Sequence, residues 1–414
     1  MRLASISTGT DLEMATPLLK PAPGSESHRV SQPSLRTFLI YFLGLGTFGF
    51  GGPIALAGRM RRDLVDARKW FSPEQYNEGL AFSQLCPGPL AAQLAMYLGW
   101  LRAGVAGATL VGVLFVLPSF LMVLALAVIY IRLGSLFWIQ GAFYGIGAAV
   151  IAIIVRSAAK LVKGTIGSDK LLWAMFVAVA IATAWSESEL VAVFVLCGLI
   201  ALGIKAPPAF VASRAQLRSR SGLGILSSGL HGEAAAGTLA ALFLFFAKAG
   251  AFVFGSGLAI IPFLYSGAVK EYHWLNDRQF LDAVAVAMIT PGPVVITAGF
   301  IGYLAAGMAG AVLAAIAVFG PPYVLVIAGA PFYRRVAANP SVKAFVQGVT
   351  AAAVGAITGA AFVLGRRAIT DLPTMLIATA TLAVIVMTKK IPEPLLIAGA
   401  GLIGVLLHGS WGRP

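Results

Sequence analysis

The stretch SQLCPGPLAAQLAMYLGW, residues 83–100, decides the fold of this chain. It places Pro87-Gly88-Pro89 between two apolar segments. Proline lacks a backbone N–H and clashes with the preceding helical turn, so two prolines around a glycine end one helix and start another. The same tripeptide recurs 204 residues later as Pro291-Gly292-Pro293. We therefore expect broken helices at two matching places.

These tripeptides belong to an internal repeat. Residues Phe48, Phe50, Gly51, Trp70 and Gln75 match, at the same offset, Phe252, Phe254, Gly255, Trp274 and Gln279. After one deletion, Gly99, Gly104, Gly107 and Pro118 match Gly302, Gly307, Gly310 and Pro321. The sequence thus predicts two homologous membrane repeats, at 36–204 and 236–410. We expect a disordered tail at 1–35 and a polar, cytoplasmic linker at 205–235.

The composition excludes a soluble protein. Of the 414 residues, 59% are hydrophobic and only 11% charged, whereas a soluble domain carries roughly 25% charged residues. Apolar runs of about 18 or more residues recur from Phe38 onward, the length that spans a bilayer. The net charge of +14 lies in short loops, so membrane topology explains it better than nucleic acid does. We expect a multi-pass protein of the inner (plasma) membrane.

The loop charges predict that the two halves have opposite orientations. The loop after the first apolar segment (36–57) holds five basic residues, Arg59, Arg61, Arg62, Arg68 and Lys69, whereas its counterpart in the second half is balanced. Cytoplasmic loops collect Lys and Arg, so opposite bias indicates inversion and an odd number of crossings per half. Segment two (74–100) would then enter and return. Arg366 and Arg367 disagree with this assignment. We predict an all-α polytopic membrane protein with two inverted-topology repeats and broken, re-entrant helices at the Pro-Gly-Pro motifs.

The broken helices are candidate substrate sites. A helix that starts inside a membrane presents free N–H groups and a positive dipole end, which suit an anion. Matching breaks in both halves are typical of a transporter site, although a kink that only relieves packing is the alternative. Gly51, Gly52 and Pro53 belong to a second motif, whose glycines serve either a ligand or helix packing. Arg59 is either a topology charge or a ligand.

Other polar residues near the breaks are candidates too. Glu78 and Asp282 match, nine residues before each tripeptide, and intramembrane carboxylates often relay protons; the alternative is a favourable place in the first turn of a helix. Gln84 and Gln93 could donate hydrogen bonds to an oxyanion or bridge helices. Lys248 lies alone in an apolar run, where it either marks a path or extends to the interface.

The motifs resemble the chromate transporter family. The resemblance lies in Gly49-Phe50-Gly51-Gly52-Pro53, Lys69-Trp70-Phe71, Gln84 to Pro89 and Gln93 to Trp100. It covers nearly everything from about 36 to 408 and is closest to the long, two-domain form. The resemblance implies inverted membrane domains and efflux of chromate coupled to protons. The second half departs from the pattern, with Gly255-Ser256-Gly257 in place of Gly51-Gly52-Pro53.

Three function classes remain to be weighed. The first is a proton-coupled chromate exporter that confers chromate resistance. The second is a sulfate-type oxyanion importer or anion channel on the same scaffold, because sulfate is also a tetrahedral dianion. The third, an intramembrane enzyme, is disfavoured because His28, His231, His273 and His408 lie outside the apolar cores. We expect no cofactor, metal or nucleotide, since no GxxxxGK[ST] loop occurs, and name a homodimer as a state to test.

Overall fold

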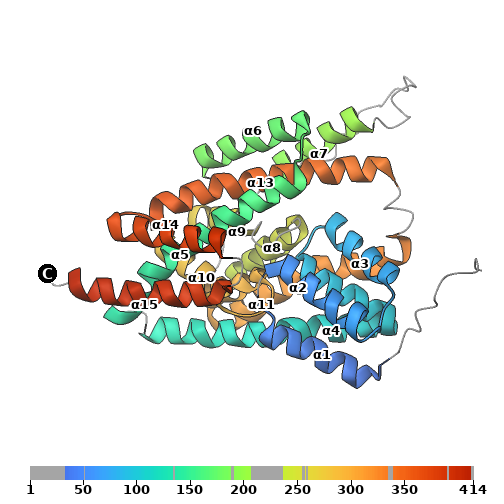
Figure 1. The fold of residues 1–414 in the computed structure, drawn as a ribbon, viewed down its shortest axis with the longest axis horizontal. Helices are drawn as coiled ribbons and strands as arrows, with labels where there is room; N and C mark the ends of the chain where they lie inside the picture. Colours follow the sequence, from blue (N-terminus) through green and yellow to red (C-terminus); the bar gives the residue numbers. More distant parts are fainter. Residues whose placement is uncertain are drawn as a thin grey trace, which may run out of the picture.

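The computed structural model describes residues 33–50, 52–133, 136–187, 191–206, 236–253, 257, 260–333, 339–388 and 391–411. Within this part the chain is helical and contains no strand, as predicted for an all-α protein. The expected tail and linker lie almost wholly outside the described residues. In Figure 1 most helices run along the long axis of the molecule.

The two halves repeat the same order of helices. The first half contains α1 (Leu35–Phe48), α2 (Gly52–Met60), η1 (Arg61–Ala67), α3 (Pro73–Leu85), α4 (Leu90–Leu133), α5 (Phe137–Thr165), α6 (Lys170–Ser186) and α7 (Val191–Lys205). The second contains α8 (Ala236–Phe252), α9 (Ile260–Tyr265), η4 (Ser266–Glu271), α10 (Asp277–Ile289), η5 (Val294–Ile296), α11 (Thr297–Gly329), η6 (Ala330–Phe332), α13 (Pro340–Ala368), α14 (Leu372–Met387) and α15 (Glu393–Trp411).

Four stretches of the described chain are long and apolar enough to cross a membrane. They are Leu90–Leu133, Phe137–Thr165, Val294–Phe332 and Pro340–Ala368. The repeat pairs the first with the third and the second with the fourth, so both halves contribute equally to the membrane-spanning bundle.

Matching caps fix the start of α3 and α10. The Ser72 hydroxyl accepts a hydrogen bond from the Gln75 N–H at 3.2 Å, while the Gln75 side chain accepts one from the Ser72 N–H at 3.0 Å. Asn276 and Gln279 form the same capping box before α10. Such reciprocal bonds satisfy N–H groups that a helix start leaves free. The repeated glutamines thus have a structural role.

Each Pro-Gly-Pro motif turns the chain back on itself. α3 ends at Leu85 and α4 begins at Leu90. The ring of Phe82, before the turn, stacks on that of Tyr97, after it, with 5.5 Å between centroids. Gly79 also faces Tyr97. α3 and the first part of α4 therefore form a re-entrant hairpin, as predicted.

α4 is itself bent into two helices. Ala103 and Gly104 have non-helical backbone angles, and Gly104 has a φ of +59°. The backbones of Gly99 and Gly107 lie against each other, which a straight helix would forbid because eight residues span about 12 Å. Glycine is required here because it adopts positive φ without strain. The turn at Ala306 and Gly307 repeats this bend in α11.

The first apolar segment also returns, which differs from our expectation that only segment two does so. α1 and α2 are separated by the break around Gly49. Tyr41 of α1 donates a hydrogen bond to Asp63 of η1 at 3.1 Å, and Phe38 packs on Phe71 with centroids 5.9 Å apart. α1 and α2 thus form a second hairpin. The glycines of this motif, like Pro-Gly-Pro, reverse the chain.

The two halves are inverted relative to each other. The hydroxyls of Thr109 in α4 and Tyr323 in α11 lie 2.6 Å apart. By the repeat, Thr109 matches Val312, and Tyr323 matches Phe120. An early residue of one helix therefore meets a late residue of its counterpart, so the matching helices are antiparallel. The predicted inversion is confirmed.

We call the end of the molecule that contains the loop before α3 the α3 end. Because the halves are inverted, the loop before α10 lies at the opposite end, which we call the α10 end. α7 ends at the α3 end, where Lys205 pairs with Asp169 at 2.5 Å. α8 begins at the α10 end, where Phe245 packs on Trp274 with centroids 5.5 Å apart. α1 also begins at the α3 end, where Phe38 packs on Phe71, so the first half begins and ends at the same end of the molecule. The odd number of crossings inferred from the loops is wrong.

The carboxyl-terminal helices are exchanged between the halves. α5 packs on α14 and α15 of the second half, and α13 packs on α6 and α7 of the first. Glycines permit these contacts: Gly145 of α5 lies against the Ala400 carbonyl of α15, and Gly348 of α13 lies against the Cys197 carbonyl of α7. The halves thus form one interlocked bundle.

Labelling will test the inversion. We expect an impermeant maleimide added to intact cells to label Glu271→Cys and not Ala67→Cys, which matches it in the first half. Both positions are exposed. Inside-out vesicles should give the reverse pattern. The background replaces Cys86 and Cys197 with serine, and labelling of both sites from one side would contradict the inversion.

A pair of glycines two residues apart will test the exchanged packing. Gly145→Ala should lower the free energy of unfolding by about 1–3 kcal/mol, because a Cβ has no room against α15. Gly147→Ala, where no heavy atom lies within 4 Å of the added Cβ, should stabilise α5 by up to about 1 kcal/mol through helix propensity. Thermal unfolding in detergent measures both. Equal effects would show that α5 and α15 do not pack tightly.

Candidate functional site

A cavity of about 1230 Å³ lies between the halves. It extends from the breaks toward the α3 end, where Gln347 of its lining contacts Lys205 at the end of α7. The first half contributes α2, the end of α3, the start of α4 and the end of α5; the second contributes the end of α10, the break after it, Tyr333, and the starts of α13 and α15. The cavity therefore depends on both repeats.

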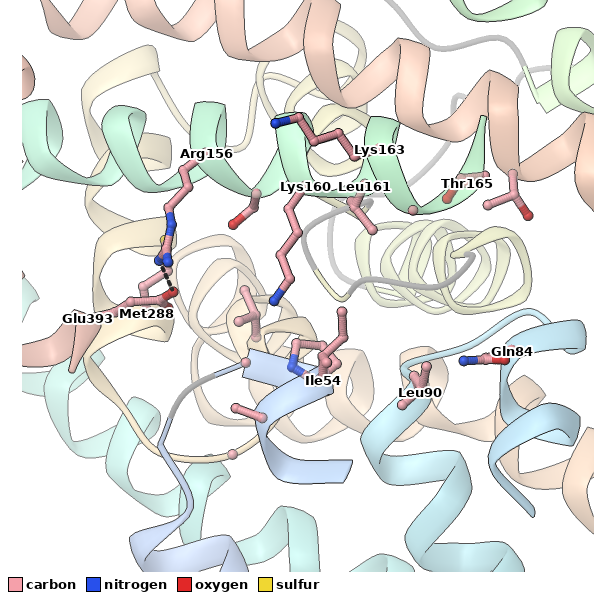
Figure 2. A pocket seen from close by; sticks show the side chains of 18 of the residues that line it. Ile54, Gln84, Leu90, Arg156, Lys160, Leu161, Lys163, Thr165, Met288 and Glu393 are labelled. Atoms are coloured by element: carbon pink, nitrogen blue, oxygen red, sulfur yellow. Dashed lines mark ion pairs between the residues drawn. The ribbon is translucent and has the colours of Figure 1, made fainter. Parts of the chain in front are cut away.

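Basic side chains dominate the charge of the cavity. Arg156, Lys160 and Lys163 follow one another on α5 at spacings of four and three residues, which places them on neighbouring turns of one helix face. Figure 2 shows Lys160 extending toward the first turn of α2, whereas the Lys163 amine points away from it. Lys343 of α13 also lines the cavity. These cations make the cavity attractive to an anion.

One carboxylate lies among these cations. Glu393, the first residue of α15, pairs with Arg156, whose Nη1 lies 3.8 Å from Oε1 (Figure 2). Both side chains are about one-third exposed. Glu393 thus already pairs with Arg156, a cation that an incoming anion would also contact.

Backbone from the two glycine-containing breaks lines the inner part of the cavity. The first turn of α2, from Gly52 to Ala55, lies on one side, with Thr290 and Gly292 of the second break on the other. A helix start presents N–H groups and the positive end of the helix dipole. The cavity therefore offers an anion this helix start as well as charged side chains.

The two breaks bond to each other. The Gly88 N–H donates a hydrogen bond to the Val253 carbonyl of the second half. In the matching place, the Gly292 N–H donates to the Gly49 carbonyl of the first half at 3.0 Å. These two glycine N–H groups are therefore occupied, which corrects our expectation that the Pro-Gly-Pro breaks leave them free for an anion.

The glycines at these crossings cannot be replaced without a clash. Gly88 has a φ of +139°, and a Cβ there would lie 2.6 Å from Gln93 and 2.8 Å from Pro322. Gly292 has a φ of +98°, and its Cβ would collide with Ser119. Only glycine combines this conformation with so close an approach.

The matching carboxylates each face a tyrosine of the other half. Asp282 is 4% exposed and accepts a hydrogen bond from the Tyr130 hydroxyl at 2.8 Å. Glu78, which is half-buried, is an electrostatic neighbour of Tyr333. Tyr333 matches Tyr130 in the repeat, and it lines the cavity. The first pair is enclosed, whereas the second borders the open cavity.

Comparison with known sequences identifies the family. The family described as "Chromate transporter" matches residues 36–203 and again 240–405. This chain belongs to the chromate transporter family. The match in two blocks follows the repeat seen in the structure, and the resemblance found from the motifs is confirmed.

Relatives of known name agree. The chain is 54% identical to the chromate transport protein of Cupriavidus metallidurans over 92% of this chain and 95% of that one. It is 52% identical to the probable chromate transport protein of Synechococcus elongatus, over 90% and 95%. A Bacillus subtilis transporter, YwrA, matches 38% of this chain at 30% identity, over 90% of its own length. No solved structure matches the chain.

The predicted substrate residues of the transporter fall into two groups. Gly52, Pro53, Gln84 and Gly292 line the cavity. The cavity lining does not include the remaining described candidates, Arg59, Pro87, Gly88, Pro89, Gln93, Lys248, Pro291 and Pro293. Gly51 lies outside the described residues.

Several residues of the second group support the breaks instead. Gln93 is fully buried, and its Nε2 donates to the Pro87 carbonyl at 2.7 Å. Arg59 donates to the Phe48 carbonyl at 3.2 Å and pairs with Asp63 at 3.7 Å. Lys248 is exposed on α8. Gln93 and Arg59 therefore hold the turns that shape the cavity.

In the sequence, the basic residues of α5 lie at the end of the apolar run 136–158, so they were grouped with the loop charges. Arg156, Lys160 and Lys163 have the spacing of one helix face, and the matching residues of α13 are Gly359, Val363 and Arg366. Arg156 and Lys160 thus have no basic counterpart, whereas Lys163 does, and a charge present in only one of two similar repeats indicates a role in that repeat alone. Among the described residues, no group of His, Cys, Asp and Glu could hold a metal ion.

Proposed function

We propose that this transporter exports chromate across the cytoplasmic membrane, with coupling to protons, and thereby confers resistance to chromate. The observation that supports this most is the cavity between the halves, lined by four cationic side chains and one carboxylate. Chromate is a tetrahedral dianion, and charges at a partly dehydrated site attract it far more strongly than the same charges in water.

The orientation follows from the charges at the two ends. At the α3 end, Arg61, Arg62, Arg68, Lys69 and Lys170 belong to loops or helix ends. At the α10 end, the Arg367 guanidinium, which disagreed with the loop rule, pairs with Glu187 and Asp277. Because cytoplasmic loops collect positive charge, we place the α3 end, and the mouth of the cavity, in the cytoplasm of the cell.

Binding would then begin from the cytoplasm. The anion enters at the α3 end and reaches Lys160 and the start of α2. Arg156 is shared between the anion and Glu393, which holds it at 3.8 Å. The carboxylate keeps the cation oriented when no anion is bound, and limits the affinity so that the anion can also leave.

Proton coupling would use the two carboxylate–tyrosine pairs. Uncompensated movement of a dianion through hydrocarbon is unfavourable, and a carboxylate that takes up a proton as the anion leaves reduces the charge that moves. Glu78 borders the open cavity through Tyr333, whereas Asp282 is enclosed beside Tyr130. The pairs would exchange these environments during transport.

Everted membrane vesicles test the proposal directly. Labelled chromate should accumulate inside them, faster with an imposed proton gradient than without, and sulfate should compete because it has the same shape and charge. Accumulation only in right-side-out vesicles would indicate an importer. Flux that neither saturates nor responds to the gradient would indicate a channel.

Two lysines one helical turn apart can show whether a side chain binds chromate directly or only adds positive charge to the cavity. Lys160→Gln should raise the KM for chromate by about ten- to hundredfold, because a charged hydrogen bond contributes about 1.5–3 kcal/mol. Lys163→Gln should change it by less than about threefold, since that amine points away from the start of α2 (Figure 2). Vesicle uptake over a chromate series measures both. Equal effects would mean that only the net charge of the cavity matters.

The carboxylates predict a change in pH dependence. Glu78→Gln should remove the dependence of chromate transport on the proton gradient more completely than Asp282→Asn, because Glu78 borders the open cavity. Glu78→Asp and Asp282→Glu, which keep the charge, serve as controls. The measurement is vesicle transport over a pH series. If both neutral variants keep the unmodified pH profile and rate, neither residue relays protons.

A further inference from the structure

A cluster of charged side chains joins the halves at the α10 end. Arg367, at the end of α13, contacts Glu187 through Nη2 at 2.5 Å and Asp277 through Nη1. Lys270 of η4 contacts the same Glu187 carboxylate at 2.7 Å. The Tyr265 hydroxyl donates to Asp277 at 2.7 Å, and its ring lies under Arg367 at 5.2 Å. We call Glu187, Lys270, Asp277 and Arg367 the charged cluster.

The charged cluster ties α6 of the first half to three elements of the second. Glu187 caps α6 in a left-handed conformation, with a φ of +52°. The other three members belong to η4, α10 and α13. Nearby, the Tyr130–Asp282 hydrogen bond adds a further link between the halves. Polar contacts between the two halves therefore close the α10 end.

The matching place at the α3 end cannot close in this way. The repeat puts Gly164, Pro73 and Asp66 where the second half has Arg367, Asp277 and Lys270. Instead of meeting α3, the end of α5 with Gly164 lines the cavity. The same elements are thus apart in one half and in contact in the other, so the two halves of one chain have different conformations.

The charged cluster suits a contact that must open. Its two cations and two carboxylates balance, and its side chains are 24% to 46% exposed, so separation returns them to water at small cost. The hydrogen bond from Lys270 and the charge of Arg367 hold the pKa of Glu187 below its ordinary value. The stabilisation by Glu187 is therefore present at neutral pH and is lost as the pH falls through this lowered pKa.

We propose that the charged cluster is the gate of the transporter at the α10 end, and that the halves exchange conformations when it opens. The α10 end then takes the open arrangement now seen at the α3 end, and the α3 end closes by contacts other than a matching charged cluster. An anion bound at the central breaks is thereby released on the opposite side. This inference rests on the proposed transport function.

Two matching alanines report which end is open. Ala81 lines the cavity, whereas its match, Ala285, is fully buried. In protein with Cys86 and Cys197 replaced by serine, a water-soluble maleimide should label Ala81→Cys rapidly and Ala285→Cys slowly. Adding Glu187→Gln or Arg367→Gln should raise labelling of Ala285→Cys by about tenfold and lower that of Ala81→Cys. Glu271→Gln, beside the cluster but outside it, should change neither.

Two outcomes would overturn the proposal that the charged cluster is a gate. Unchanged labelling of Ala285→Cys in both gate variants would show that the cluster does not hold the α10 end closed. A rise at both reporters would show general loosening of the fold. Because the labelling uses purified protein and no substrate, it tests the gate even if chromate transport fails in vesicles. The opposite failure, transport without a labelling change, leaves the proposed function intact.

Discussion

Backbone amides deep in an apolar bundle must find hydrogen-bond partners, and this constraint governs the centre of the molecule. A helix that is broken there exposes groups that lipid cannot satisfy. The transporter solves this by crossing its two breaks, so that the Gly88 N–H meets Val253 and the Gly292 N–H meets Gly49. Neither break is complete by itself. The crossing joins the two halves beside the cavity, which Gly49 and Gly292 line.

The sequence predicted those features that follow from local chemistry. Two prolines around a glycine end a helix through local chemistry, so the Pro-Gly-Pro turns were visible as soon as the tripeptides were aligned, whereas the isolated Pro118 stays inside α4. Loop charge predicted the inversion, because the bilayer acts on each loop separately. Arg367 was an exception to the loop-charge rule, and the structure explains it, because Glu187 and Asp277 neutralise its charge.

Contacts between distant segments were beyond sequence reasoning. The apolar run of residues 136–158 ends before Lys160 and Lys163, so both looked like loop residues, yet α5 continues to Thr165. It does so because this part of the helix lines a cavity rather than lipid. In the same way, the pairing of Asp282 with Tyr130, and the return of the first segment, depend on neighbours far away in the chain.

The joining of two repeats in one polypeptide has an evolutionary consequence. If such a bundle were assembled from two identical half-length chains, every substitution would occur twice, once at each end. Here the repeats are covalently fused, so Arg156 and Lys160 could arise in one while Gly359 and Val363 occupy the other. Fusion therefore permits the two ends of the molecule to differ, with basic residues of one repeat lining the cavity and a charged cluster joining the two repeats at the α10 end.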